Sequence, residues 1–379
     1  MRSGIVIFVV LLLVGCRSLP EGALAGAELP EHPQLLWEHR HNVRTVASPL
    51  AYDGMILFCD KHGQLKGLDE DTGEELLSIA LGADMEASFA IADSTLYVGM
   101  IDGRVRALSL KDGAERWSFE TEGQIAAAPV LATIDNQQRL FVGSYDNNMY
   151  TLSPQTGRLI HRIETGYYIN GAAVLWHNYA LFGGCDAWVR IVDGTTGEST
   201  DSLQLDAYIP ASPVVETFVV GDGMSEMGNQ VYVADYRGDV YELTLSEGRI
   251  QNHRKLLSAA DDDDGGMLSV PVVTEDAVYV LTPNRRLVCL DRKDGKERWH
   301  AVLKGDVGEC SPVLVDDRLL VCTKTGVVTI HDAATGQQLW EYETGEQIIS
   351  QPVVGESRFY IQTARGTLLC FGEEKINNL

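Results

Sequence analysis

Four consecutive carboxylates, Asp261 to Asp264, form the densest group of possible ligands in this 379-residue chain, and Gly265-Gly266 follows them. Carboxylate oxygens are the ligands that Ca²⁺ prefers, but calcium loops use alternating positions, and consecutive residues rarely converge on one ion. We therefore expect a solvated acidic loop at this point of the chain and no metal site.

Cysteine thiols are the second group that could do chemistry. The chain has seven cysteines, and the six that follow Cys16 show no C-x-x-C spacing, so zinc, redox-pair and haem-attachment sites lack support. Cys59 and Cys322 fall at the same point of the repeat described below, which favours buried core thiols. Cys310 is expected on a strand beside Cys322 but facing the other way, so a disulfide between them is the less favoured alternative.

Cys16 differs from the other cysteines in what precedes it. Arg2 is followed by ten apolar residues at positions 5–14 and then by Gly15-Cys16. The run is too short for an ordinary transmembrane helix and has the length of an export signal. The letters L-V-G-C that end in Cys16 resemble the processing site of bacterial lipoproteins. We expect residues 1–15 to be a signal peptide and Cys16 to be lipidated; an uncleaved anchor or an ordinary secretory signal is the alternative.

Charge and composition bear on partners and location. The chain has 30 basic and 54 acidic side chains, a formal net charge of −24, which opposes phosphate backbones, so we expect no nucleic-acid partner. Residues 16–33 carry no strand pattern and are expected to be a tether. Arg17, rather than Asp, follows Cys16, and by resemblance to Gram-negative sorting signals this implies a lipid anchor in the outer membrane, with the protein facing the periplasm.

The elements that must position all these residues repeat eight times. Each unit has an inner strand, a short turn, a second strand, a Gly-containing turn, a third strand, a T-G or D-G turn and an outer strand. The steps between units are 40, 40, 43, 41, 58, 41 and 40 residues, and a period of about 40 to 45 residues with several short strands predicts a β-propeller. We expect an all-β fold, an eight-bladed β-propeller with four-stranded antiparallel blades. The units begin at Ser48-Pro49, Ser88-Phe89, Ala128-Pro129, Gly171-Ala172, Ser212-Pro213, Val270-Pro271, Ser311-Pro312 and Gln351-Pro352.

The last unit ends at Phe371 without an outer strand, and a matching strand lies near the N-terminus. Residues 35–39 (LLWEH) resemble the outer strand at 338–342 (QLWEY). We expect this N-terminal strand to close the last blade, which leaves no open gap with unpaired edges between first and last blades. The predicted propeller spans residues 34–372, and residues 373–379 form a C-terminal tail.

The repeat resembles the PQQ-like propeller family over about residues 35–371, through its Pro-led inner strands, D-G turns and outer strands with Trp117, Trp299 and Trp340 four residues after a turn Gly. We expect these Trp side chains to pack between blades. The family includes quinoprotein alcohol dehydrogenases and the BamB lipoproteins of outer-membrane β-barrel assembly. The resemblance therefore implies the fold and leaves the function open.

The quinoprotein enzymes need a quinone pocket, a calcium cage and a carboxylate base, and their methanol-oxidising branch also has two adjacent cysteines. This chain has no adjacent cysteines and no long insertion to build a lid. We expect no catalytic residue and no cofactor, and a non-catalytic scaffold with a BamB-like role. The alternative is a propeller that binds a quinone or another small ligand, either as an enzyme or as a sensor.

Aromatic and Arg side chains gather in the loops of blades three to six, in turns between second and third strands and in links between blades. Such residues are favoured at protein interfaces, so we expect a partner surface for another envelope protein, such as a β-barrel assembly component. The alternative is that the rings only pack neighbouring loops. A further insertion, around Gly221–Gly228, should project from the opposite face. The expected partner-binding residues are Tyr167, Tyr168, Trp188, Tyr208, Tyr236 and Arg237.

Overall fold

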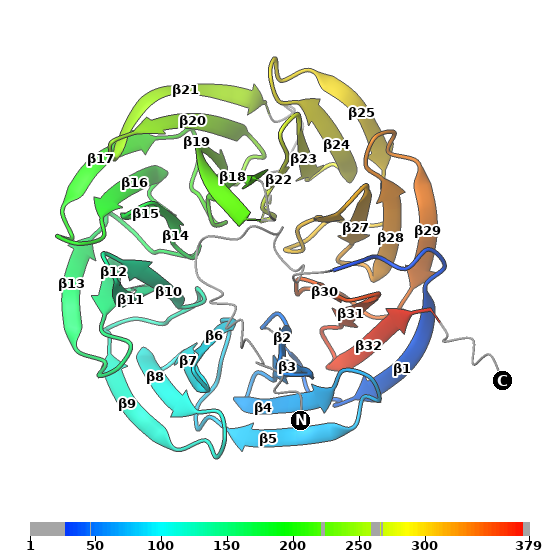
Figure 1. The fold of residues 1–379 in the computed structure, drawn as a ribbon, viewed down its shortest axis with the longest axis horizontal. Coiled ribbons are helices and arrows are strands. Elements are labelled where there is room, and N and C mark those ends of the chain that lie inside the picture. The colour runs from blue at the N-terminus through cyan, green and yellow to red at the C-terminus, as the bar shows by residue number, and fades with distance from the viewer. Residues whose placement is uncertain (1–26, 46, 221–223, 259–265, 267, 374–379) are drawn as a thin grey trace, which may run out of the picture.

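The computed structural model describes residues 27–45, 47–220, 224–258, 266 and 268–373. Eight four-stranded antiparallel sheets surround a central axis (Figure 1), which confirms the eight-bladed β-propeller. Each of the first seven blades uses four consecutive strands, β2–β5 through β26–β29, and the eighth has the order β1-β32-β31-β30. Cys16 and the acidic run at 261–264 lie outside the described residues.

The strands fall into four classes by their distance from the axis. The inner strands are β2 (Leu50–Tyr52), β6 (Phe89–Ala92), β10 (Val130–Ile134), β14 (Val174–Trp176), β18 (Val214–Val220), β22 (Val272–Val273), β26 (Val313–Val315) and β30 (Val353–Gly355). The second strands are β3 (Met55–Cys59), β7 (Thr95–Gly99), β11 (Gln137–Gly143), β15 (Tyr179–Gly183), β19 (Met224–Ala234), β23 (Ala277–Thr282), β27 (Arg318–Cys322) and β31 (Arg358–Gln362).

The third strands are β4 (Gln64–Asp69), β8 (Arg104–Ser109), β12 (Asn148–Leu152), β16 (Trp188–Asp193), β20 (Val240–Ser246), β24 (Arg286–Asp291), β28 (Val327–Asp332) and β32 (Thr367–Gly372). The outer strands are β5 (Glu75–Ala80), β9 (Glu115–Glu120), β13 (Leu159–Glu164), β17 (Ser199–Gln204), β21 (Arg249–Leu257), β25 (Glu297–Val302), β29 (Gln338–Glu343) and β1 (Gln34–Arg40).

The core lies between adjacent blades, because each sheet must cover the apolar face of the next. All five residues of β7 are buried, whereas the outer strand β17 has no fully buried residue. One cluster joins Leu57 and Leu65 of blade one to Leu96 and Val98 of blade two. Second strands such as β7 are therefore covered on both faces, whereas third strands such as β8 keep exposed or half-buried polar positions.

The N-terminal strand closes the last blade, as predicted. β1 pairs antiparallel with β32, from Gln34 opposite Gly372 to Arg40 opposite Thr367, with a bulge between Leu35 and Trp37. In Figure 1 the blue β1 lies beside the red β32, so the two ends of the described chain meet in one sheet.

Outer-strand rings join several blades to the next one, as expected for Trp117 and Trp299. Trp117 Nε1 donates to the Pro154 carbonyl at 2.8 Å, in the third turn of the following blade. A Cβ on Gly157 of that turn would lie 2.5 Å from the indole, so only glycine allows this close contact. His161 takes the Trp position in blade three and lies 2.9 Å from the Thr195 carbonyl of blade four.

A belt of hydroxyl and amide side chains links the starts of the inner strands, which gives the Ser-Pro pairs a structural role. Ser48 Oγ accepts from the Gln351 amide at 3.0 Å, across the junction of the last and first blades. The Ser48 amide in turn donates to Ser88 Oγ at 2.9 Å. Similar bonds join Ala172 to Ser212, Val270 to Ser311 and Ser311 to Gln351.

Many acidic residues act in turns rather than in clusters. Asp53, Asp135 and Asp316 adopt positive φ in turns between first and second strands, a conformation that Asp tolerates better than most residues. The Asp332 carboxylate accepts from the backbone amide of Thr335 at 2.7 Å in a third turn, and Asp69 accepts from Thr72 in the same way. These local bonds give several of the acidic residues a structural role in turns.

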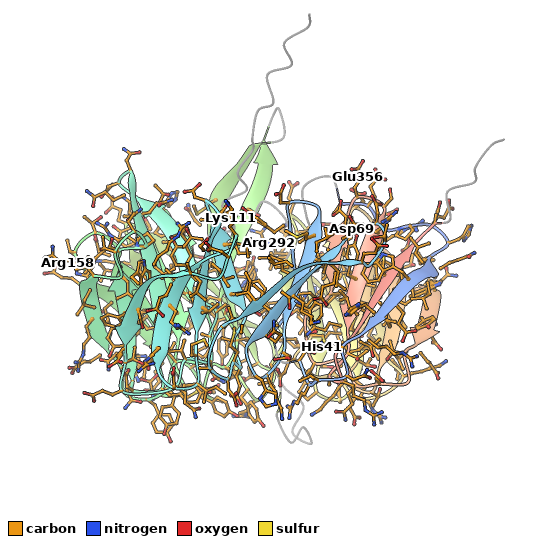
Figure 2. The ribbon with its side chains drawn as sticks, turned by 90° about the horizontal axis from the view of Figure 1, so that it is seen from below. His41, Asp69, Lys111, Arg158, Arg292 and Glu356 are labelled. Carbon is orange, nitrogen blue, oxygen red and sulfur yellow. The ribbon has the colours of Figure 1, made fainter. Side chains whose placement is uncertain are left out.

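The propeller has two faces, which we name by their loops. The link face carries the turns between second and third strands and the links between blades; the hairpin face carries the other turns. The β18–β19 hairpin projects beyond the hairpin face (Figure 2), opposite to the link face as expected, although β19 already begins at Met224, within the predicted insertion. In the described residues, no helix is long and apolar enough to span a membrane.

The last part of the expected tether packs against the propeller. Leu29 is buried in the cluster between blades seven and eight. The Glu28 amide donates to the Gly355 carbonyl at 3.2 Å, and Arg318 Nη1 donates to the Pro30 carbonyl at 3.2 Å. The described part of the expected tether, residues 27–33, therefore includes contacts with the propeller. These contacts also show that the chain reaches the propeller on the hairpin face.

Candidate protein-binding face

The aromatic loops of blades three to five lie on the link face, which is the geometry that the sequence predicts. The structure places Tyr167 and Tyr168 between β13 and β14, Trp188 at the start of β16, Tyr208 between β17 and β18, and Tyr236 and Arg237 between β19 and β20. It brings these residues together in two separate groups rather than in one patch.

The first group joins three tyrosines of blade three. The rings of Tyr145 and Tyr168 stack with centroids 4.8 Å apart and an interplanar angle of 6°, and Tyr167 lies 4.4 Å from Tyr168. The Tyr145 hydroxyl donates to Asn170 Oδ1, and burial raises the pKa of Tyr145. Tyr167 remains 49% exposed and Tyr168 38% exposed, so this aromatic stack presents two large rings to solvent.

The second group is a pair from adjacent blades. Tyr208 and Tyr236 stack with centroids 4.3 Å apart and an angle of 22°, and the Tyr236 amide donates to the Tyr208 carbonyl at 2.9 Å. Burial and a hydrogen bond with Tyr236 both raise the pKa of Tyr208. Both rings are half-buried, so part of their surface packs the loops and part remains available to a partner.

Trp188 and Arg237 flank these groups. Trp188 is half-buried and has no ring contact with another described residue, while Arg237 is exposed. The Arg237 amide donates to Asp235 Oδ1 at 3.1 Å, which fixes the turn but leaves the guanidinium outside. Trp188 and Arg237 therefore share the link face with the two tyrosine groups, and Trp188 has no ring contact with either group.

The turn at Cys185 and Asp186 lies between the two groups, and sequence reasoning missed it. The Cys185 amide donates to the Tyr168 carbonyl at 2.8 Å, and Asp186 Oδ2 accepts from the Gly166 amide at 2.8 Å. Burial alone would raise the pKa of Asp186, but hydrogen bonds from Arg190 lower it. No local motif marks this turn, because its partners lie in the previous link.

An ionic cluster beside Tyr236 was also missed. Lys255 Nζ lies 2.6 Å from Asp239 and 2.8 Å from Asp206, and it sits 5.1 Å from the centroid of the Tyr241 ring. Burial raises the pKa of buried Asp235. Burial would lower the pKa of Lys255, but its two carboxylate partners raise it, so its charge offsets this acidic edge. The pairing of β20 with β21 places Lys255 opposite Tyr241. A prediction of this register from the sequence would have found the cluster.

The arrangement suits recognition of a protein surface. Rigid tyrosines bury much area with little loss of side-chain freedom, and Arg adds directional donors. Across the described part of the chain, no three His, Cys, Asp or Glu side chains are grouped so that they could hold a metal ion. The six described cysteines are free thiols, and Cys310 Sγ lies 3.1 Å from the Ser350 carbonyl.

Comparison with known proteins matches most of the chain. A family model described as outer membrane protein assembly factor BamB matches residues 30–251, 136–302 and 286–375. BamB of Shewanella oneidensis is 23% identical over 356 residues, which cover 85% of this chain and 83% of that protein. BamB of Burkholderia pseudomallei is 32% identical over 301 residues, covering 77% of this chain and 64% of that protein.

Solved structures show the same fold at lower identity. BamB from Moraxella catarrhalis superposes with a TM-score of 0.71 and 17% identity, covering 90% of this chain and 100% of that chain. A europium-containing methanol dehydrogenase superposes with a TM-score of 0.73 and 12% identity, covering 92% of this chain and 95% of that chain. At such identities the likeness extends to the propeller alone, because this fold carries both enzymes and non-enzymes.

Proposed function

This chain belongs to the BamB family of outer membrane protein assembly factors, and from that membership we propose that it is a non-catalytic envelope scaffold with a BamB-like role. The scaffold binds a component of the machinery that assembles outer-membrane proteins. One observation carries the proposal beyond family membership: two stacked tyrosine groups lie on one face of the propeller, with large exposed rings at Tyr167 and Tyr168.

The lipid anchor is part of the same proposal. Cys16 would carry the lipid, and the described chain begins on the hairpin face, where Glu28 bonds to Gly355. The hairpin face then lies toward the outer membrane, and the link face with its tyrosines points into the periplasm. This orientation supports a role in which the link face meets a periplasmic partner domain.

The test is partner capture by crosslinking in detergent-solubilised envelopes. Tyr167→Ala and Arg237→Ala change two exposed side chains, so the melting temperature should stay nearly unchanged. At a hot spot each substitution should weaken partner binding by about 2 kcal/mol or more. The matched controls are Arg158→Ala, labelled in Figure 2, and Leu159→Ala at the start of β13, both beside the third turn of blade three on the hairpin face.

Two results would contradict the proposal. Undiminished capture by Tyr167→Ala, Arg237→Ala and Trp188→Ala would remove the link face of blades three to five as the partner surface. A quinone absorbance in the purified protein, or calcium-dependent dye reduction, would instead support the ligand-binding alternative.

A further inference from the structure

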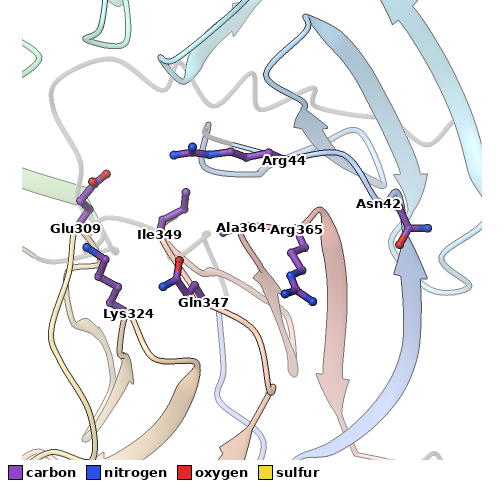
Figure 3. Close-up of a pocket in the computed structure, with 8 residues that line it drawn as sticks. All are labelled: Asn42, Arg44, Glu309, Lys324, Gln347, Ile349, Ala364 and Arg365. Carbon is purple, nitrogen blue, oxygen red and sulfur yellow. The ribbon is translucent and has the colours of Figure 1, made fainter.

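A pocket of about 650 Å³ opens on the link face, across the ring from the tyrosine groups. Its walls come from the β1–β2 link, the links on both sides of blade seven, and the second turns of blades seven and eight, as Figure 3 shows. The lining residues are Asn42, Arg44, Glu309, Lys324, Gln347, Ile349, Ala364 and Arg365.

The pocket is basic although the protein is strongly acidic. Three of its lining side chains, Arg44, Lys324 and Arg365, are cations and only Glu309 is an anion, whereas the whole chain has 30 basic and 54 acidic side chains. No side-chain hydrogen bond or ion pair engages any of the three cations within the described residues. They are therefore free to donate to an incoming anion, and charge-assisted bonds from Arg and Lys are among the stronger polar contacts.

Glu309 is the single anion among three cations in this lining. Figure 3 shows the Arg44 side chain reaching across the pocket toward Glu309, with Lys324 near it on the other side. Burial raises the pKa of Glu309 more than the charges of Lys324 and Arg44 lower it. Its carboxylate is thus poorly stabilised where it is, and an acidic ligand would compete with it for the same two cations.

The remaining lining favours a peptide over a bare ion. Asn42 and Gln347 provide amide donors and acceptors of the kind that pair with a peptide backbone, while Ile349 and Ala364 provide apolar surface. The volume lies in the range of about 300–1,000 Å³ that is usual for sites enclosing a ligand larger than an ion.

We propose that this pocket binds an acidic segment of a partner protein, with carboxylates that reach Arg44 and Lys324. The proposal rests on the scaffold function given above and adds a second contact on the same face. One partner could then engage the tyrosine groups of blades three to five and the basic pocket of blades seven, eight and one. A membrane headgroup is the less favoured anion, because the described chain starts on the opposite face.

Fluorescence anisotropy with fluorescein-labelled hexaglutamate tests this directly on the mature chain. At about 150 mM salt the Debye length is about 8 Å, so distant negative charges are screened while contacts in the pocket persist. The double variant Arg44→Glu/Lys324→Glu should bind hexaglutamate at least about tenfold more weakly, a loss of about 1.4 kcal/mol. Glu309→Gln, which removes the competing carboxylate, should bind it more tightly than wild type.

Lys111→Glu/Arg158→Glu is the matched control, because it makes the same change in net charge with two exposed cations of the hairpin face (Figure 2). Its affinity for hexaglutamate should equal that of wild type. If charge reversal in the pocket lowers the melting temperature, Arg44→Gln/Lys324→Gln gives the same comparison with a smaller change.

Three outcomes would overturn the proposal: no binding of hexaglutamate by wild type, equal losses in pocket and control variants, or binding of phosphatidylglycerol vesicles that depends on Arg44 and Lys324 and is not displaced by hexaglutamate. The last outcome would assign the pocket to lipid headgroups. None of these results depends on Tyr167 or Arg237. A failure of the pocket proposal is therefore distinguishable from a failure of the scaffold proposal.

Discussion

His41 and Asp60 connect the closing strand to blade one at the level of single side chains. His41 follows β1 and Asp60 follows β3, and Nε2 of the first lies 2.7 Å from Oδ2 of the second. Asp60 Oδ1 also accepts from the amides of His62 and Gln64, at 2.9 and 3.0 Å. The Asp60 side chain is only 4% exposed. Its burial would raise the pKa of Asp60, but these hydrogen bonds lower it below the ordinary value.

Asp60→Asn should destabilise the folded state at pH 7 by about 1–3 kcal/mol, because the amides of His62 and Gln64 lose a charged acceptor at a buried position. A folded pKa below the unfolded value near 3.9 means that the carboxylate contributes stability above that pH. The contribution is lost as pH falls through the folded pKa. The deficit of Asp60→Asn, measured by urea unfolding, should therefore shrink between pH 7 and pH values below about 4.

Asp84→Asn provides the control for this prediction. Asp84 also faces a histidine, His62, at 3.3 Å, but the two side chains are 61% and 59% exposed, so its substitution should change stability by no more than about 0.5 kcal/mol. Equal deficits for the two variants, or a deficit for Asp60→Asn that does not change with pH, would show that the buried carboxylate has no special role.

At the scale of elements, β1 is the strand that completes the ring. It covers the edge of β32 and carries Trp37, whose Nε1 donates to the Glu70 carbonyl at 3.3 Å in the third turn of blade one. The Trp37 ring also lies 5.9 Å from Tyr360 and covers Gly73. The contact repeats the one between Trp117 and blade three, so the junction of blades eight and one is built like the other junctions.

A chain that starts at residue 40 should therefore be far less stable than one that starts at residue 27. It loses the pairing of β1 and the Trp37 contact, and burial of a Trp is typically worth roughly 3–5 kcal/mol, somewhat less here because the ring is half-buried. Starting at residue 27 instead of 17 should leave the melting temperature unchanged, since the buried Leu29 is retained. Equal melting temperatures for the starts at 27 and 40 would rule out N-terminal closure as a stabilising device.

At the scale of the whole molecule, the two faces carry different loops and different connections. The hairpin face receives residues 27–33 and projects the β18–β19 hairpin, while the link face carries the tyrosine groups and the basic pocket. A lipid on Cys16 would therefore hold the propeller by the face opposite to its two proposed binding surfaces. Both surfaces would then be open to a periplasmic partner.

Cys16→Ala should abolish lipidation and release a soluble periplasmic protein with an unchanged melting temperature. One acyl chain gives only marginal attachment, so stable anchoring needs the several chains that lipoprotein processing adds. The measurement is palmitate labelling together with fractionation of the envelope. Labelling that persists in Cys16→Ala would contradict the assignment of the lipid to this residue.

The sequence by itself determined the number of blades, their strand order and the closure of the ring. These features follow from local patterns: apolar strands, turn residues such as Asp316, and a repeat near forty residues, which recur wherever a blade forms. The match between residues 35–39 and 338–342 was enough to predict that β1 completes blade eight. The aromatic residues lie in turns between second and third strands and in links between blades, and these positions likewise determined which face they occupy.

Only the tertiary structure decided which of these side chains meet. It stacks Tyr208 on Tyr236 and Tyr168 on Tyr145, leaves Trp188 without a ring contact, and buries Leu29 where composition alone predicted a tether. It also gathers Arg44, Lys324 and Arg365 around one pocket. Such contacts depend on the angle between adjacent blades and on loop paths, and no short-range pattern in the chain encodes a distance between residues that lie hundreds of positions apart.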